Sequence, residues 1–160
     1  MLRDDEVYTL SKCPRIKKFK SYTREQRSHK TIALAGVKYT TKNFKYVGKD
    51  LQRDKPFLLS VLSDKNVLSS VVQYFPSEIK KDVAIMSNAV ENRGYEGFQH
   101  APQVVRDEYA DNKEVIMKGI RKNRLAIKFA SKRLRGDREV ALAAIKTHID
   151  ISKVVSYIDT

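Results

Sequence analysis

Apolar residues recur along the chain in a pattern typical of short amphipathic helices that each begin at a capping residue. Four segments show it most clearly, and they start at Asp54, Asp82, Asn112 and Asp137. Apolar residues stand three and eight positions after each start; they are Phe57 and Leu62, Ile85 and Val90, Val115 and Ile120, and Val140 and Ile145. Asp and Asn side chains cap helix N-termini, and this spacing places the apolar residues on one face. The pattern therefore predicts four helices with these starts.

Two weaker copies of the pattern begin at His29 and Asp4. The six starts are 25, 25, 28, 30 and 25 residues apart, and such a period is typical of helical repeat arrays. We therefore expect one all-α domain over residues 1–160, a solenoid-like array of about six two-helix repeats starting near residues 4, 29, 54, 82, 112 and 137. The alternative is a compact helical bundle with the same local hairpins. Residues 37–47 are rich in β-branched and aromatic side chains and are also compatible with a strand pair, although the repeat register favours a helix there.

The second half of each repeat recurs as well. It aligns Phe129 with Tyr46 and Tyr74, and Leu134 with Leu51 and Ile79. We expect one second helix per repeat that presents the aromatic residue and the leucine inward, and we expect Phe19 to be buried as the aromatic residue of a degenerate copy.

The seventh position of the first helix is small in five of six repeats, which lets helices approach closely; it holds Ser11, Gly36, Val61, Ala89, Gly119 and Ala144.

One repeat departs from the pattern between Glu91 and Asp111. It contains Gly94, Gly97 and Pro102, which disfavour a continuous helix. We expect a short or broken second helix there, followed by a loop near residues 102–108. Loops on rigid scaffolds often bind ligands, although a tolerated insertion explains the same residues.

The segment Asn123–Ile145 resembles an uncharacterised family of tandem helical-hairpin repeats, catalogued as a domain of unknown function. The family is common in large DNA viruses, phages, protists and intracellular bacteria. Its pattern reads approximately N-x-x-A-L-x-x-A-S-x-x-L-x-x-D-x-x-V-x-L-x-A-V. The residues in or near this pattern are Asn123, Ala126, Ile127, Ala130, Ser131, Leu134, Asp137, Val140, Leu142, Ala144 and Ile145. The resemblance implies an α-helical repeat and transfers no functional residues.

Positive charge is concentrated in two parts of the chain. The 32 Lys and Arg exceed the 19 Asp and Glu by 13, and residues 12–49 hold twelve basic residues against Glu25 alone. Residues 113–138 hold ten basic residues against two acidic ones. On one continuous helix, Arg121, Arg124, Lys128 and Lys132 would share a face, where like charges repel unless an anion lies along it. The candidate binding residues are Lys17, Lys18, Lys20, Arg24, Arg27, Lys30, Arg121, Lys122, Arg124, Lys128, Lys132, Arg133 and Arg135.

Residues typical of catalysis or metal binding are sparse. Cys13 is the only cysteine, the three histidines lie far apart, and the glycines do not form a phosphate-binding loop. We therefore expect no enzyme, no metal, no cofactor and no small-molecule substrate. No run of 18 apolar residues is present, so we expect no membrane span. A single cysteine fits the cytoplasm, or a host cytoplasm if the protein is viral.

The charge pattern favours a non-catalytic binding module for nucleic acid or a nucleoprotein, engaged through phosphate groups. Tyr22, beside the first basic cluster, is a candidate for stacking on bases. A different class of function is a protein–protein adaptor or inhibitor that docks on an acidic partner surface, which Tyr95, Phe98 and Tyr109 in the acidic middle of the chain would favour. A structural subunit of a large assembly, or a basic surface without a partner, would also fit this charge pattern. The oligomeric state is left open.

Overall fold

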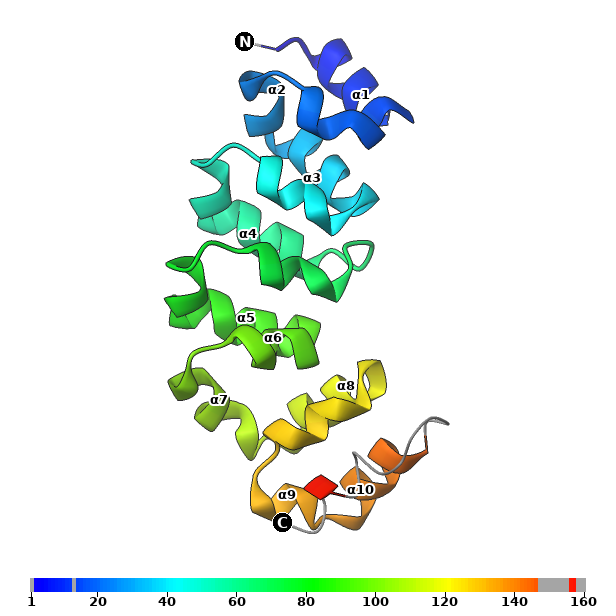
Figure 1. Ribbon diagram of the computed structural model, residues 1–160, viewed down its shortest axis with the longest axis vertical. Helices are drawn as coiled ribbons and strands as arrows, with labels where there is room; N and C mark the ends of the chain where they lie inside the picture. The colour runs from blue at the N-terminus through cyan, green and yellow to red at the C-terminus, as the bar shows by residue number, and fades with distance from the viewer. Residues whose placement is uncertain (1, 13, 147–155, 158–160) are drawn as a thin grey trace. The chain divides into compact units, whose positions relative to one another are not determined.

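The computed structural model describes residues 2–12, 14–146 and 156–157, and of residues 14–17 it describes the backbone alone. Within these ranges the chain is helical and contains no strand, which confirms the all-α expectation (Figure 1). The alternative of a strand pair over residues 37–47 is therefore wrong, and the helical structure that the repeat register favours there is confirmed. The chain divides into two compact units, Met1–Ile79 and Lys80–Thr160, and each is described by itself below. A single domain over the whole chain stays a prediction.

Unit 1 consists of short α-helices and 3-10 helices, the latter marked η. Its elements are α1 (Asp4–Lys12), η1 (Pro14–Ser21), α2 (Arg24–Ser28), α3 (Lys30–Tyr39), η2 (Thr41–Tyr46), η3 (Leu51–Arg53), α4 (Lys55–Ser63) and η4 (Ser69–Tyr74). The next element along the chain, η5 (Ile79–Lys81), begins at the last residue of unit 1. The elements of unit 2 are α5 (Val83–Arg93), α6 (Tyr95–His100), α7 (Gln103–Ala110), α8 (Lys113–Lys122), η6 (Arg124–Phe129), α9 (Lys132–Arg135) and α10 (Arg138–Ile145).

Four helices begin directly after the predicted capping residues. In α4, α5, α8 and α10 the side chain of the cap accepts a hydrogen bond from the backbone N–H three residues later. The bonds join Asp54 to Phe57 (2.8 Å), Asp82 to Ile85 (3.1 Å), Asn112 to Val115 (3.1 Å) and Asp137 to Val140 (3.2 Å). Each satisfies a donor that the first helical turn leaves unpaired. The four predicted starts are confirmed, whereas α3 begins after His29 without a side-chain cap.

In three of the predicted repeats, the second half is two short helical segments and not one helix. In three repeats a six-residue 3-10 helix ends at an extended residue, which is Val47, Phe75 or Ala130. A second short segment then follows, η3, η5 or α9 respectively. The aligned aromatic residues stand directly before the break and are half-buried, so the expectation that they face the core is met only in part. The aligned leucine positions are buried as expected, with Leu51, Ile79 and Leu134 at most 7% exposed.

The small seventh position lets neighbouring elements touch. A Cβ atom added to Gly36 in α3 would lie 2.8 Å from the ring of Phe19, which is fully buried as expected. A Cβ atom added to Gly119 in α8 would lie 3.1 Å from the Cβ atom of Ala126 in η6. Both distances are shorter than ordinary carbon–carbon contacts, so glycine permits the close approach.

The irregular repeat is interrupted, but it contains no long loop. Helix α5 ends at Arg93 and is followed by Gly94, whose φ of 57° is unfavourable for residues with a side chain. A Cβ atom on Gly97 would lie 2.3 Å from the carbonyl oxygen of Ala89, so α6 lies directly against α5. The loop expected near residues 102–108 is wrong, because Pro102 stands before the first residue of α7, where its fixed φ is compatible with a helix start.

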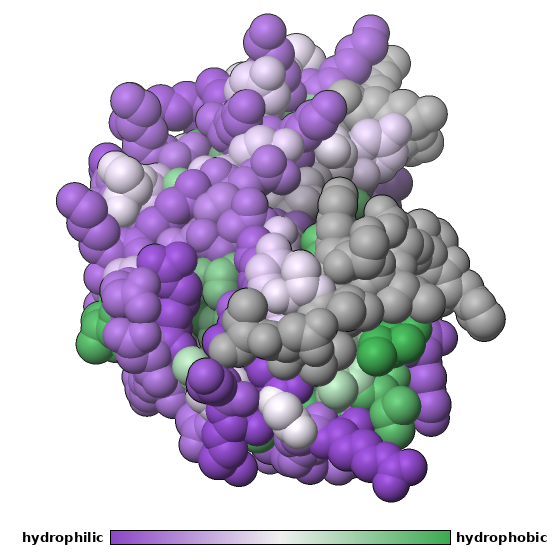
Figure 2. Space-filling model, turned by 60° about the horizontal axis from the view of Figure 1, so that its bottom comes forward, coloured by the Kyte–Doolittle hydropathy of each residue, from purple (hydrophilic) through white to green (hydrophobic). Residues whose placement is uncertain are grey.

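The face drawn in Figure 2 is covered mainly by hydrophilic residues, with hydrophobic residues in small separate patches. Across the described ranges, no helix combines the length and the apolar character needed to cross a membrane.

Candidate functional site

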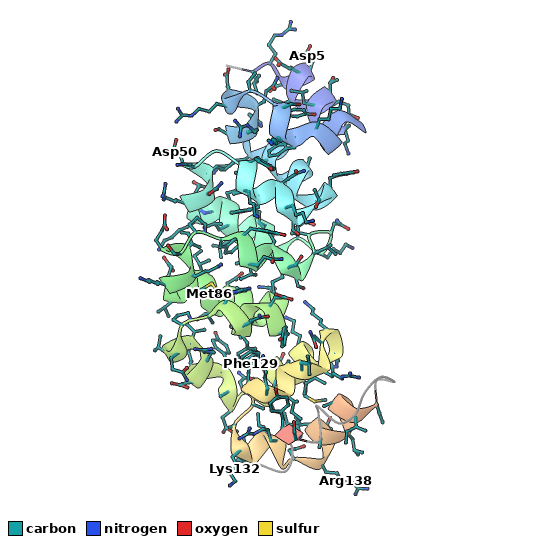
Figure 3. All side chains as sticks on the ribbon, viewed as in Figure 1. Asp5, Asp50, Met86, Phe129, Lys132 and Arg138 are labelled. Atoms are coloured by element: carbon teal, nitrogen blue, oxygen red, sulfur yellow. The ribbon has the colours of Figure 1, made fainter. Side chains whose placement is uncertain are left out.

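The basic residues of unit 2 do not share one helix face. Arg121 lies in α8, Arg124 and Lys128 lie in η6, and Lys132 lies in α9. Asn123 is extended between α8 and η6, with φ −154° and ψ 111°, and its side chain caps η6. Helical spacing therefore does not continue across the segment, and the expected ridge of four like charges is wrong. Figure 3 shows Lys132 projecting outward from unit 2.

Lys128 already has aromatic partners within unit 2. Its Nζ atom lies 4.9 Å from the ring centroid of Tyr95 and 4.8 Å from that of Phe129, and it donates to the hydroxyl of Tyr95 at 3.3 Å. The ring of Phe129 in turn stacks on that of Phe98, with the centroids 5.1 Å apart. A cation over two rings gains energy from them, which makes Lys128 less available to an external anion.

Two further cations of this cluster have internal partners. Arg133 donates from Nε and Nη2 to the carboxylate of Asp111 at 3.1 and 3.0 Å. Hydrogen bonds from Arg133 and then from Ser131 lower the pKa of Asp111. The ammonium of Lys122 donates to the backbone carbonyl of Asn92. Of the seven predicted binding residues in unit 2, Arg121, Lys122, Lys132 and Arg133 are exposed, and Arg124, Lys128 and Arg135 are half-buried.

In unit 1 the predicted residues divide into paired and unpaired cations. Lys30 forms an ion pair of 3.0 Å with Asp54, and Lys20 is exposed with its Nζ atom 5.8 Å from the ring centroid of Tyr46. Lys18 and Arg24 are exposed. The side chain of Lys17 lies outside the described part of the structure. Tyr22 is half-buried, with its ring centroid 5.7 Å from that of Phe19; its stacking on a base stays a prediction.

One cavity of unit 1 is lined by four cations and by no carboxylate. Its volume is about 480 Å³, and its lining residues are Arg24, Arg27, Lys45, Val47, Gly48, Lys49 and Gln52. We call it the basic cavity. Arg24 and Arg27 were expected in a binding surface, but sequence reasoning missed Lys45 and Lys49. The charged run 12–49 contains both. Only the fold shows that the end of η2, which carries Lys45, and the link after it, which carries Lys49, lie against α2.

Gly48 and Gln52 hold this link in place. The backbone N–H of Gly48 donates to the carbonyl of Arg27 at 3.1 Å, and a Cβ atom on Gly48 would lie 2.0 Å from the hydroxyl oxygen of Ser28. The side-chain amide of Gln52 donates to the carbonyls of Phe44 at 3.1 Å and Val47 at 2.8 Å. These contacts fix the backbone that carries Lys45 and Lys49 next to α2.

The guanidinium of Arg27 is held without being neutralised. Its Nε atom donates to the carbonyl of Tyr22 at 3.1 Å, and Nη1 donates to that of Tyr46 at 2.9 Å. Carbonyl oxygens orient the group but carry no net charge. Within the described part of the chain, none of the four cavity cations pairs with a carboxylate, whereas Lys38 on α3 pairs with Asp64 at 2.6 Å. Lys45 has an aromatic partner, since its Nζ atom lies 5.0 Å from the ring centroid of Tyr74, so Arg24, Arg27 and Lys49 are the more available cations.

Acidic residues close to the basic cavity in sequence do not line it. Glu25 follows Arg24 and Asp50 follows Lys49, yet neither is among the lining residues. Figure 3 shows Asp50 projecting outward at the edge of unit 1. The positive charge of the lining is therefore not balanced from within the cavity.

Among the described residues, no group of three or more His, Cys, Asp or Glu is placed to hold a metal ion. Burial, and next the charge of Lys80, lower the pKa of His100 below its ordinary value of 6.5, so this imidazole is neutral at pH 7. His29 stands between α2 and α3. His148 lies outside the described residues.

Residues 112–158 match a family described as Domain of unknown function (DUF4116). The match covers 47 of the 160 residues and includes α8, η6, α9 and α10 of unit 2. It agrees with the resemblance of Asn123–Ile145 to an uncharacterised family, and it assigns no activity. No curated protein and no solved structure matches the chain.

Proposed function

We propose that the protein is a non-catalytic module that binds nucleic acid, or a nucleoprotein, through phosphate groups. The observation that carries this proposal is the basic cavity, where Arg24, Arg27, Lys45 and Lys49 converge without a carboxylate. Phosphate contacts supply most of the affinity in binding that does not depend on sequence. The exposed Lys18 and Lys20 on η1 extend the positive surface of the same unit.

The proposed architecture is a solenoid-like array of about six repeats. Four helices share the same capping hydrogen bond, and three second halves share the same break after a six-residue 3-10 helix. Repeats that cannot bury their apolar faces alone gain a common core by stacking, and stacked repeats present extended binding surfaces. This geometry would suit an elongated polyanion.

The salt dependence of binding tests the proposal. If the four cavity cations together with Lys18 and Lys20 contact about four to six phosphates, the log–log slope for duplex DNA should be about −4 to −5, and it should be shallower for single strands. The double variant Lys18→Gln/Lys20→Gln should flatten that slope by about two, because each lost phosphate contact removes about 0.9. The matched control Lys65→Gln/Lys81→Gln removes the same charge from exposed lysines outside residues 12–49 and should change the slope less.

The proposal fails if the full chain binds neither duplex nor single strands at about 50 mM salt. A pull-down with and without nuclease gives an independent answer. Partners that are all lost after nuclease treatment support nucleic acid, and partners that are all retained support a protein partner.

A second candidate, docking of an acidic protein segment, is favoured by a groove of about 600 Å³ on unit 1. Leu34, Tyr39 and Phe57 supply its apolar surface. Lys12, Lys30 and Lys38 also line it. Lys30 and Lys38 are already paired with carboxylates of the chain, so this groove offers an anion less free charge than the basic cavity does.

A further inference from the structure

The geometry points to a phosphate monoester or pyrophosphate group as the ligand of the basic cavity. This inference deepens the proposed function and in part rests on it. The proposed ligand is a terminal or multiply charged phosphate, as distinct from the diester groups along a nucleic-acid backbone. Such a ligand is supplied either by the 5′-phosphorylated end of a strand or by a free polyphosphate, and these two sources share the same chemistry.

The positive charge of the basic cavity favours a multiply charged ligand. Four cations line one cavity, and a diester offers each site only one negative charge. A terminal phosphate carries a charge of about −1.5 to −2 at pH 7, and a pyrophosphate group carries more. Bringing the multiply charged group into the cavity reduces repulsion among Arg24, Arg27, Lys45 and Lys49 more fully than a diester does.

The concave shape of the basic cavity favours a terminal or free phosphate group. The site is a hollow of about 480 Å³, within the range of about 300–1,000 Å³ that is typical of small-ligand pockets. The diester groups of a duplex lie on a convex surface, and each has a neighbour on both sides. They can therefore contact the edge of the cavity but cannot easily enter it. A strand end or a free polyphosphate has no such neighbour on one side and can enter.

Part of the basic cavity is held in position by hydrogen bonds within the protein. Arg27 is oriented by two backbone carbonyls before any ligand arrives, and its Nη2 atom has no hydrogen bond among the described contacts. The side-chain amide of Gln52 donates to the carbonyl of Val47 and so stabilises the link that carries Lys49. Donors that are already held in position lose little conformational freedom on binding, which favours affinity. A planar guanidinium also presents paired N–H groups that match phosphate oxygens.

Titration of the full chain with inorganic pyrophosphate, followed by calorimetry, tests the cavity without nucleic acid. Arg24→Gln and Lys49→Gln should each weaken pyrophosphate binding about tenfold, as expected for loss of a charge-assisted hydrogen bond. The matched control is Lys42→Gln, an exposed residue of η2 that does not line the cavity, and it should change affinity by less than about twofold. Arg24, Lys42 and Lys49 are all exposed, and thermal melting should confirm that the variants fold.

Strand ends are tested with one oligonucleotide carrying either a 5′-phosphate or a 5′-hydroxyl. A cavity that takes the strand end binds the phosphorylated form about tenfold more tightly, and pyrophosphate competes with it. If pyrophosphate binds and the two oligonucleotides bind equally or not at all, the ligand is a free polyphosphate and the inference stands without the strand end.

Two outcomes overturn the inference. One is the absence of pyrophosphate binding by the unaltered chain. The other is equal weakening by Lys42→Gln and Lys49→Gln, which would show a response to overall charge and not to the cavity. In either case, salt-dependent binding of oligonucleotides would still support the proposed function, so the two failures are distinguishable.

Discussion

Gly36 illustrates how a single residue position sets the packing of unit 1. It lies in α3 under the ring of Phe19, and a Cβ atom there would meet that ring at 2.8 Å. Gly36→Ala should destabilise the protein by up to about 2 kcal/mol, since crowding a packed core costs about 1–3 kcal/mol and the higher helix propensity of alanine offsets about 1 kcal/mol. Urea unfolding measures the difference.

Gly136→Ala is the matched control for this substitution. Gly136 has φ −80°, and the atoms nearest to an added Cβ lie 3.7 Å away, at ordinary contact distance. Alanine fits this conformation and reduces the freedom of the unfolded chain, so stability should stay the same or rise by up to about 1 kcal/mol. Equal loss in both variants would show that Gly36 is not in close contact with Phe19.

Residue-scale prediction from sequence succeeded where one local interaction decides the outcome. Asp54 and Asp137 were identified as caps because the capping carboxylate and the N–H that donates to it lie three residues apart in the chain. The basic cavity could not be found in this way. Lys45 and Lys49 face Arg24 only because Gly48 brings a later segment against α2, and charge counts carry no information on such long-range contacts.

At the scale of elements, the start of α4 combines a cap with a link to the preceding first helix, α3. The carboxylate of Asp54 accepts from the N–H of Phe57 and pairs with Lys30 at the start of α3. The hydrogen bond from Lys30, and next that from Phe57, lower the pKa of Asp54 below its ordinary value of 3.8. A lowered pKa means that the folded state favours the ionised carboxylate.

This linkage predicts how stability changes in acid. The contribution of Asp54 is fully present above pH 3.8 and is lost as the pH falls through the lower pKa of the folded state. Asp54→Asn retains a good cap but removes the charge, so its stability difference from the unaltered protein should shrink as the solution becomes more acidic than pH 3.8. Unfolding midpoints measured from about pH 6 to about pH 2 test this.

The control for the acid experiment is Asp50→Asn, in the same unit. Asp50 precedes η3 and makes no side-chain cap hydrogen bond. Its substitution should show less dependence on pH than Asp54→Asn. If both variants follow the same pH profile, the cap and the Lys30 pair do not account for the acid response.

The broken second half of three predicted repeats shows why element boundaries could not be predicted from the sequence. Alignment placed Tyr46, Tyr74 and Phe129 at one position, and the structure gives all three the same half-buried environment before an extended residue. The sequence therefore predicted which positions are equivalent. It did not predict the break, because Val47, Phe75 and Ala130 share no residue type that excludes a helix.

At the scale of the whole molecule, the net charge and the number of repeats predict different properties. Unit 1 holds 16 basic and 8 acidic residues, and unit 2 holds 16 and 11, so both are positive. Net charge predicts attraction to polyanions but not where they bind, because ion pairs such as Arg133–Asp111 neutralise part of the surplus. The repeat count instead leads to a prediction about dimensions, which depends on stacking and not on charge.

The radius of gyration in solution distinguishes the proposed array from a compact bundle. A compact chain of this length has a radius of gyration of about 15 Å. Six repeats stacked about 9–10 Å apart form a body about 55–60 Å long, and with two layers of helices its radius of gyration is about 18 Å. Small-angle X-ray scattering of the monomer should give the larger value, with a distance distribution skewed to long separations. A symmetric distribution with a radius of about 15 Å would instead favour the bundle. It would also remove the extended surface on which an elongated polyanion was proposed to lie, while leaving the basic cavity of unit 1 intact.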